Sequence, residues 1–515
     1  MADLLLVNAN IITMDEDKPR GKGVAVKEGK ILAVEDADCL MQLKTERTEV
    51  INLSGKTVLP GFIDAHLHFR AFAESLVVLN LDPHKGFCSI SDIKDKIREQ
   101  AKKLPRGTWI RAGGYSEIYL AEKRHPNRFD LDQSAPDHPV KLTHRSGHAH
   151  VLNSKALEIA GITRETPEPD GGIIDRDLDH GDPTGIFFGL GDFLQQKVPP
   201  LDETELAKGV KIAENKLFSY GITSFQDASA RNNKERWQWF EGLKGGGSLR
   251  PRVTMMLGLE GFTQLKEREF LFCTDVADLL YGGVKIVVDE TTGRISPSQN
   301  ELNEIVLSIQ KMGQQAIIHA IEETAIKAAI DAIEYASKVC PRFDHRHRIE
   351  HCSVCPPELA EKMALHKIMV VTNPAFLYFS GDRYLQTVIP EQFQFLYPIA
   401  SLKKTGLCVA AASDSPIACA NPLVGIYAAV TRLAETGVVI LENEVITPCD
   451  AIRMYTESAA RSSFEENVKG TISPGKYADF VVLSADPLCV PECEIKNIEV
   501  EITIMNGEVV WMANG

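Results

Sequence analysis

The segment that decides the fold reads Pro60-Gly61-Phe62-Ile63-Asp64-Ala65-His66-Leu67-His68, a short apolar run that ends in two histidines separated by one residue. The run predicts a buried strand, and residues two apart on a strand point to the same face. His66 and His68 therefore project together, on the same face as Asp64. Two imidazoles beside a carboxylate can hold a divalent metal ion, provided that other segments supply further ligands.

The composition is that of a large globular protein. The chain has 515 residues, of which 44% are hydrophobic and 25% charged, enough for one large domain and one smaller domain. Its formal net charge of −15 argues against nucleic acid or an anionic membrane as a partner. We expect a small-molecule substrate, and homodimerisation stays open.

The N-terminal segment and the cysteines bear on location. Residues 1–10 show no basic segment followed by a long apolar core, and no apolar run reaches the roughly 20 residues that span a bilayer. The eleven cysteines are scattered, which is typical of free thiols. We therefore expect a cytoplasmic protein. Cys352 and Cys355 have CxxC spacing, but no second such pair exists, which disfavours a redox or zinc role for them.

Both ends of the chain read as short β-strands. Residues 23–34 predict a hairpin, and Asn506-Gly507 is a strong turn signal between two strands near the other end. We expect a composite β-sandwich domain of residues 1–57 and 465–515, with the large domain of residues 58–464 inserted between its halves.

The middle of the chain alternates strands with helices. After the strand that ends at His66, seven further strands are predicted at 221–225, 253–257, 284–288, 316–319, 348–351, 368–371 and 408–411. Helical periodicity follows several of them. Eight such units form an α/β fold, the (β/α)8 TIM barrel, whose active site lies at the carboxyl ends of the strands. Residues 70–220 are too long for one connection and predict an inserted subdomain.

Three more polar residues stand at predicted strand ends. His319 ends the fifth strand, His351 ends the sixth, and Asp414 follows the eighth. Because these ends converge on one mouth of a barrel, we expect all three beside His66 and His68. Nitrogen and oxygen ligands of this kind favour zinc, with manganese, iron or cobalt as alternatives.

Two further features admit more than one interpretation. Lys285, on the fourth strand, could pair with Asp289, or its amine could have reacted with carbon dioxide to form a carbamate that bridges two metal ions. His345 and His347 form a second His-x-His, but they precede a strand. We therefore interpret that pair as structural or surface histidines at the opposite end of the barrel.

These motifs resemble the metal-dependent amidohydrolase superfamily, and specifically its YtcJ-like (amidohydrolase-3) branch. Besides the first strand, the matching segments include Ser146-Gly147-His148-Ala149, His347-Arg348-Ile349-Glu350-His351, Ser413-Asp414-Ser415-Pro416 and the run from Ile472 to Phe480. The resemblance covers essentially the whole chain. It implies a distorted (β/α)8 barrel, a small β-sandwich and one or two divalent metal ions.

The resemblance also implies roles for individual residues. The more buried ion would be held by His66, His68 and Asp414. The second ion would be held by His319 and His351, with Lys285 bridging if carboxylated. The segment around His148 would reach over the barrel mouth, where His148 could hydrogen-bond the substrate carbonyl.

Substrate contacts are expected where the chain departs from the family pattern. The departures follow strand ends, at residues 290–294, at Glu322-Glu323 and in an aromatic-rich loop over residues 376–384. They leave the substrate open. The candidate contacts are Tyr115, Arg294, Tyr378 and Arg383.

The predicted chemistry is hydrolysis of an amide-type C–N bond, as in an N-acyl or N-formyl amine or a cyclic amide. A metal-activated hydroxide would attack the carbonyl, Asp414 would act as general base and acid, and His148 would help to polarise the carbonyl. The alternatives are hydrolytic deamination of a heterocycle, ester or carbamate hydrolysis in the same fold, and a metal-binding regulatory protein that has lost catalysis.

Overall fold

The computed structural model describes residues 1–169, 171–267, 278–290 and 293–513. The chain forms two compact units. The first comprises Met1–Phe69, Ala213–Glu290 and Arg294–Gly515, and the second comprises Arg70–Ile212 together with Thr291–Gly293.

An eight-stranded parallel sheet forms the centre of the first unit, in the order β21-β20-β19-β18-β17-β16-β15-β8. Its strands are β8 (Phe62–Leu67), β15 (Ile222–Asp227), β16 (Arg252–Leu257), β17 (Leu279–Val287), β18 (Ala316–Ala320), β19 (Arg348–His351), β20 (Met369–Thr372) and β21 (Val409–Ala411). The segment after β21 returns to β8, where Asp414 N donates to His66 O at 2.8 Å and His68 N donates to Ser415 O at 2.9 Å. These bonds join the two edges of the sheet, and the predicted α/β barrel is confirmed.

Helices follow the barrel strands along the chain. They include α8 (Lys234–Gly245), α9 (Leu259–Lys266), α10 (Gln299–Lys311), α11 (Glu323–Val339), α12 (Pro357–Leu365), α13 (Ala375–Thr387), α15 (Ile399–Lys404), α16 (Pro422–Thr431), α17 (Pro448–Met454) and α18 (Glu457–Arg461). In α11 the buried residues Ala325, Ile326, Ala329, Ile330 and Ile333 recur at helical spacing, so one apolar face packs against the sheet.

One helix corrects the sequence-based expectation. Residues 376–384 were expected to form a loop, but they lie within α13. Leu377, Gly381 and Tyr384 are buried on this helix at spacings of four and three, which is the helical period. The apolar face formed at this spacing belongs to a cluster with Tyr397 and Ile440, so packing stabilises the helix.

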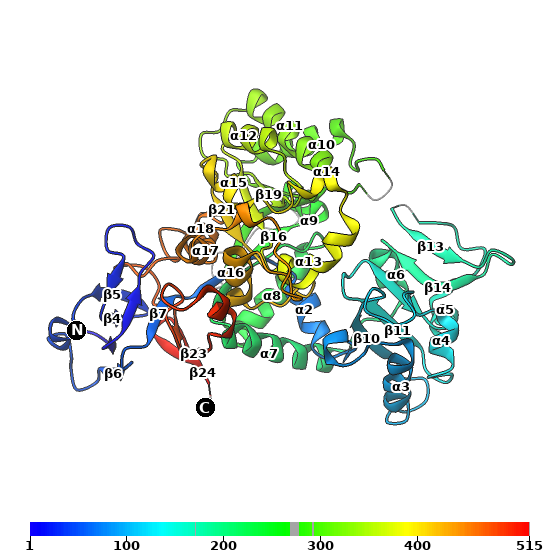
Figure 1. The fold of residues 1–515 in the computed structure, drawn as a ribbon, viewed down its shortest axis with the longest axis horizontal. Coiled ribbons are helices and arrows are strands. Elements are labelled where there is room, and N and C mark those ends of the chain that lie inside the picture. Colours follow the sequence, from blue (N-terminus) through cyan, green and yellow to red (C-terminus); the bar gives the residue numbers. More distant parts are fainter. Residues whose placement is uncertain (170, 268–277, 291–292, 514–515) are drawn as a thin grey trace. The chain divides into compact units, whose positions relative to one another are not determined.

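The two ends of the chain build two β-sheets together. One sheet has the order β5-β4-β1-β6 and the other β24-β23-β22-β7-β2-β3. The strands are β1 (Leu4–Val7), β2 (Asn10–Ile12), β3 (Arg20–Gly21), β4 (Val24–Lys27), β5 (Lys30–Val34), β6 (Glu49–Asn52), β7 (Thr57–Pro60), β22 (Phe480–Leu483), β23 (Val500–Met505) and β24 (Glu508–Met512). β7 pairs antiparallel with β22, so N-terminal (blue) and C-terminal (red) segments lie side by side (Figure 1).

A single apolar core joins these sheets. Leu6, Val26 and Val58 come from the N-terminal half, and Phe480 and Ile504 from the C-terminal half. The β23–β24 hairpin turns at Asn506 and Gly507, whose φ angles of 52° and 77° are those of the predicted turn.

Buried charges link the barrel to the terminal sheets. Arg252, at the start of β16, donates to both carboxylate oxygens of Asp479 at 2.9 and 3.1 Å, and it also contacts Asp278. Its guanidinium lies 3.6 Å from the centroid of the Tyr477 ring. Arg252 and Asp479 are both buried, so each charge must be neutralised by the other to be tolerated in the interior.

The second unit is built on a six-stranded mixed sheet. Its order is β13-β14-β12-β11-β10-β9. The strands are β9 (Leu79–Asn80), β10 (Ile110–Tyr115), β11 (Val140–His144), β12 (Ala149–Leu152), β13 (Ile173–Arg176) and β14 (Pro183–Phe188). The helices include α3 (Ile90–Ala101), α4 (Arg128–Asp132), α5 (Ser154–Ala160) and α6 (Gly191–Lys197). Among the described residues of the whole chain, no helix is long and apolar enough to cross a membrane.

Candidate metal centre

The carboxyl end of β8 and the segment after β21 bring three predicted ligands together. One ligand atom each from His66, His68 and Asp414 lies within 4.8 Å of the other two. Asp414 Oδ1 is 2.9 Å from His68 Nε2 and 3.6 Å from His66 Nε2. His66 and Asp414 are buried, while His68 is partly exposed. Solvent therefore reaches the group mainly at His68.

The other predicted ligands border this group. Lys285 Nζ, from β17, lies 3.3 Å from His66 Nε2. The ring centroid of His351, at the end of β19, is 5.0 Å from that of His66 and 4.4 Å from that of His319 on β18. The first, fourth, fifth, sixth and eighth strands of the barrel therefore contribute to one cluster of nitrogen and oxygen donors.

Left-handed backbone directs two of these side chains. His351 has a φ of 71° and Asp414 a φ of 57°, and Cys352 follows His351 with 49°. Non-glycine residues adopt this region rarely and at a free-energy cost of about 1–3 kcal/mol. At His351 the conformation breaks the alternation of β19, so that Glu350 and His351 both lie near His66 instead of on opposite faces.

Three residues that sequence reasoning did not assign hold the imidazoles in place. His66 Nδ1 hydrogen-bonds to Glu350 Oε2, His351 Nδ1 lies 2.7 Å from Asn373 Oδ1, and His68 Nδ1 lies 3.2 Å from Ser229 Oγ. Each contact engages Nδ1 and leaves Nε2 for a metal ion. Glu350 stands next to a predicted ligand in the sequence, which was the one signal available for it.

Burial dominates the electrostatics of the cluster. It holds the pKa of His66 well below its usual value, and the neighbouring Lys285 lowers that pKa further. Burial also lowers the pKa of Lys285 to about 8, against the opposing charges of Glu350 and Asp414. Burial alone would raise the pKa of Asp414, but its close contact with His68 and the charges of His351 and Lys285 together outweigh burial, and the pKa falls. The site thus favours a neutral His66 imidazole and an ionised Asp414 carboxylate, the forms that bind metal.

The donor set fits a divalent ion. Asp414 Oδ1 is buried and lacks a well-aligned hydrogen bond within the protein, so an acceptor oxygen stands ready beside two imidazole nitrogens. Imidazole nitrogens and a carboxylate oxygen this close together are the donors that zinc and similar divalent ions bind. His66, His68 and Asp414 would hold one ion, and His319, His351 and Lys285 line the adjoining space.

Asp64 has a different role from the one its position suggested. Its Oδ1 accepts from Ser413 N at 3.1 Å and its Oδ2 accepts from Ser413 Oγ at 2.5 Å, while His66 N donates to Oδ1 at 3.2 Å. Burial raises its pKa to about 6, although these hydrogen bonds oppose the rise. Asp64 therefore ties β8 to the segment that carries Asp414.

The predicted substrate contacts of the first unit lie on different elements. Tyr378, on α13, packs against Phe379 and Tyr427, and its hydroxyl lies 3.5 Å from Lys496 Nζ. Arg383, also on α13, stacks on Tyr384. Arg294 is exposed, and Thr291 and Thr292, which precede it by three and two residues, lie outside the described residues. Contact between these side chains and a substrate stays a prediction.

The two predicted residues of the second unit differ in exposure. His148 is exposed, whereas Tyr115 is buried in the core of that unit, with its hydroxyl 2.9 Å from His125 Nδ1. Their proposed roles toward a substrate likewise stay predictions.

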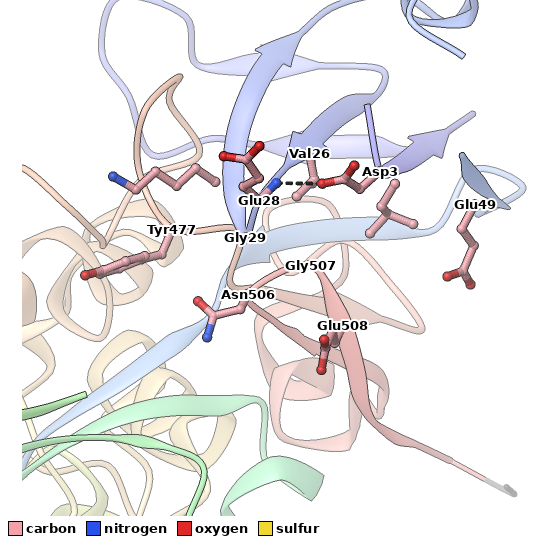
Figure 2. Close-up of a pocket in the computed structure, with 11 residues that line it drawn as sticks. Asp3, Val26, Glu28, Gly29, Glu49, Tyr477, Asn506, Gly507 and Glu508 are labelled. Atoms are coloured by element: carbon pink, nitrogen blue, oxygen red, sulfur yellow. Dashed lines mark hydrogen bonds between the residues drawn. The ribbon is translucent and has the colours of Figure 1, made fainter. Parts of the chain in front are cut away.

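Two other features have no part in the metal centre. His345 and His347 are buried before β19, where His347 Nδ1 accepts from Ala316 N and His345 Nε2 contacts His366 O. A cavity of about 530 Å³ in the terminal sheets is lined by Asp3, Glu28, Glu49, Tyr477 and Glu508, among others (Figure 2). Its lining holds no histidine or cysteine, so it offers no imidazole or thiolate ligand.

Known proteins resemble this chain in sequence and in fold. The model of the Amidohydrolase family matches residues 49–511. An N-substituted formamide deformylase from Arthrobacter pascens is 29% identical over 548 residues, which cover 100% of this chain and 99% of that protein. The amidohydrolase YtcJ from Bacillus subtilis (strain 168) is 28% identical over 527 residues, which cover 97% of this chain and 98% of that protein.

A solved structure agrees with these relatives. The crystal structure of a metal-dependent hydrolase from Pyrococcus horikoshii OT3 superposes with a TM-score of 0.77 at 25% identity, over 95% of this chain and 99% of that one. The chain therefore belongs to the amidohydrolase family, and it is a metal-dependent hydrolase that acts on carbon–nitrogen bonds.

Proposed function

We propose that the protein hydrolyses the amide bond of an N-substituted formamide or a related N-acyl amine or cyclic amide, with zinc as the metal. The observation that carries the proposal is the position of Asp414, whose buried Oδ1 lies between His66 Nε2 and His68 Nε2. The similarity of the whole chain to the N-substituted formamide deformylase from Arthrobacter pascens supports the formamide class.

Asp414 would move the proton in this reaction. A bound divalent ion lowers the pKa of water and polarises a carbonyl oxygen. The ionised Asp414 carboxylate, whose pKa is held low by His68, accepts the proton from the attacking water. It then gives that proton to the nitrogen as the C–N bond breaks, because an amine anion is a very poor leaving group. The products are a carboxylic acid and an amine.

Lys285 would complete the site as a carbamate. Its amine is fully buried beside His66, and burial lowers its pKa to about 8, so a neutral amine is accessible near neutral pH. In this step the amine nitrogen bonds to the carbon of carbon dioxide and one proton leaves to solvent. The resulting carbamate would offer two oxygens, one toward His66, His68 and Asp414 and one toward His319 and His351. Isotopically labelled bicarbonate would reveal it as a carbamate carbon signal in the NMR spectrum.

A turnover screen tests the proposed function. The zinc-loaded protein is offered N-substituted formamides, N-acyl amines, cyclic amides, carbamates, esters and aminoheterocycles, with Asp414→Asn as the control. Release of formate or another carboxylic acid, lost in the control, supports the proposal. Ammonia release from an aminoheterocycle alone would identify a deaminase and overturn it. Turnover of esters or carbamates alone would overturn the assignment to amides.

A further inference from the structure

A chain of polar side chains crosses the interior of the barrel and ends at His66. Arg348, on β19, is fully buried. It donates to Gln226 Oε1 at 2.5 Å, to Ser462 O at 3.3 Å and to Ala65 O at 3.0 Å. These contacts come from three different segments of the first unit, so the guanidinium is fixed from several sides.

Arg348 in turn fixes Glu350. Its Nε lies 2.7 Å from Glu350 Oε1, and both side chains are fully buried. The other carboxylate oxygen, Oε2, contacts His66 Nδ1 and accepts a longer hydrogen bond from Arg348 Nη2 at 3.4 Å. A carboxylate paired with a guanidinium can only accept a hydrogen bond, so the proton of the neutral His66 imidazole resides on Nδ1. The lone pair of His66 Nε2 is then directed toward Asp414 and Lys285.

The three positioning partners of the imidazoles differ in charge. His68 faces the hydroxyl of Ser229 and His351 faces the amide oxygen of Asn373, both neutral acceptors. Only His66, within this set, has a carboxylate partner, and hydrogen bonds to ionised acceptors are roughly twice as strong as those to neutral ones. His66 is also the ligand that contacts both Asp414 and Lys285. Its orientation therefore affects the whole cluster.

We propose that Glu350 is a positioning residue of the metal centre, which uses its Arg348-anchored carboxylate to keep His66 protonated on Nδ1 and so keeps Nε2 available to the ion. The inference rests on the metal site of the proposed function. Because Glu350 acts through His66, it needs no contact with the substrate.

Glu350→Gln is a sharp test because of Arg348. The guanidinium of Arg348 has no acceptor atom, and its closer contact is with Oε1, at 2.7 Å against 3.4 Å for Oε2. The amide oxygen of the glutamine would therefore take the Oε1 position, and its NH2 group would face His66 Nδ1. That donor favours the tautomer with the proton on Nε2, which cannot bind a metal ion. We expect the affinity for Zn²⁺ to fall by roughly 10- to 100-fold, measured by competition with a chromophoric chelator. The absorption spectrum of the Co²⁺-loaded protein should change as well.

Glu465→Gln is the matched control. Glu465 is also buried in the first unit, where it pairs with Lys469 at 2.8 Å and accepts from Thr254 Oγ1 at 2.8 Å. The control loses a buried charge of the same kind, so it should lower the melting temperature of the metal-free protein. Its Zn²⁺ affinity should nevertheless stay within about threefold of the wild type, because the contacts of Glu465 are with Lys469 and Thr254 rather than with a predicted metal ligand.

A double variant separates positioning from misfolding. In Arg348→Met/Glu350→Gln the amide is free to present its oxygen to His66, and no uncompensated guanidinium remains. Zn²⁺ affinity should recover part of the loss seen in Glu350→Gln. Glu350→Gln binding Zn²⁺ as tightly as the wild type would overturn the inference alone, as would a loss of the same size in Glu465→Gln. A wild-type protein that binds no divalent metal would overturn both the inference and the proposed function.

Discussion

Asp414 Oδ1 lies 2.9 Å from His68 Nε2, so the segment after the eighth barrel strand meets the residue just after the first. The same two segments exchange backbone hydrogen bonds between Asp414 and His66 and between His68 and Ser415. Closure of the barrel and assembly of the site are therefore one structural event. Any change that breaks the hydrogen bonds between β8 and the segment after β21 should also separate Asp414 from His66 and His68.

Asp414→Asn should abolish turnover without unfolding the protein. The amide has nearly the same shape as the carboxylate, but it cannot take a proton from water. We expect kcat to fall by at least about 100-fold, with a melting temperature close to that of the wild type. Asp331→Asn, which removes a surface carboxylate paired with Lys327, is the control and should leave kcat unchanged. An Asp414→Asn variant within about tenfold of wild-type kcat would contradict the role of Asp414 as general base.

Asn373→Ala should weaken metal binding at the His319 and His351 side of the cluster. Asn373 Oδ1 accepts from His351 Nδ1, and Asn373 Nδ2 donates to Ala412 O at 3.3 Å, which fixes the orientation of the amide. Its loss frees the ring of His351, and metal affinity should fall by about tenfold or more. The bound metal is measured by elemental mass spectrometry after dialysis.

The control for this change is Asn421→Ala. Asn421 caps α16 through a hydrogen bond from Leu423 N at 3.1 Å, and its loss should cost stability alone, about 1 kcal/mol. Equal metal content in both variants would show that the contact with Asn373 does not hold His351 for a metal ion.

Lys244 should make stability depend on pH in the alkaline range. It lies near the end of α8, where its Nζ donates to Arg250 O and Pro251 O, and burial lowers its pKa from 10.5 to about 8. Between these two values the unfolded chain binds more protons than the folded one, so the free energy of unfolding rises with pH. The rise should be about 1 kcal/mol. Urea unfolding at pH values across this window should show the slope in the wild type and a smaller one in Lys244→Met.

Much of the site followed from spacing alone, because strand ends converge in a barrel. A residue placed directly after an apolar run, such as His66 or His319, needed only the strand assignment. Residues whose position does not follow from a strand end were harder to predict. Glu350 and His351 are adjacent in sequence, and alternation would place them on opposite faces. The left-handed φ of His351 brings the side chains of Glu350 and His351 to the same site. The local sequence contains no pattern that predicts this backbone conformation.

The remaining differences between the sequence-based expectations and the structure come from contacts between residues that are far apart in the sequence. Asn373-Pro374 is a helix-start signal just before residues 376–384, but the aromatic content of these residues suggested a substrate-binding loop. The structure buries one face of α13 against residues such as Tyr397 and Ile440, which lie later in the chain. Tertiary packing thus decided a local conformation that propensity left undecided. Similarly, the pairing of Asp64 with Ser413 joins residues 349 positions apart.

Arg252→Met should destabilise the protein strongly. The substitution leaves Asp479 buried without its guanidinium partner, and breaking a buried pair in this way costs about 3–5 kcal/mol. Arg20→Met is the comparison, since Arg20 pairs with Asp486 at the surface with 44% of its side chain exposed. That change should cost less than about 1 kcal/mol. Both values come from denaturant unfolding of the metal-free protein, and equal losses would contradict the importance of the buried link.

The pairing of β7 with β22 has a consequence for biosynthesis. β7 leaves the ribosome early, but its antiparallel neighbour β22 and the following hairpin are translated only after every barrel strand. Until then β7 lacks that neighbour, and the apolar side chains of Val58 and Leu6 lack Phe480 and Ile504 to pack against. Unpaired strand edges and uncovered apolar surface favour aggregation. During synthesis, the N-terminal strands should therefore need protection by chaperones for longer than any other part of the chain.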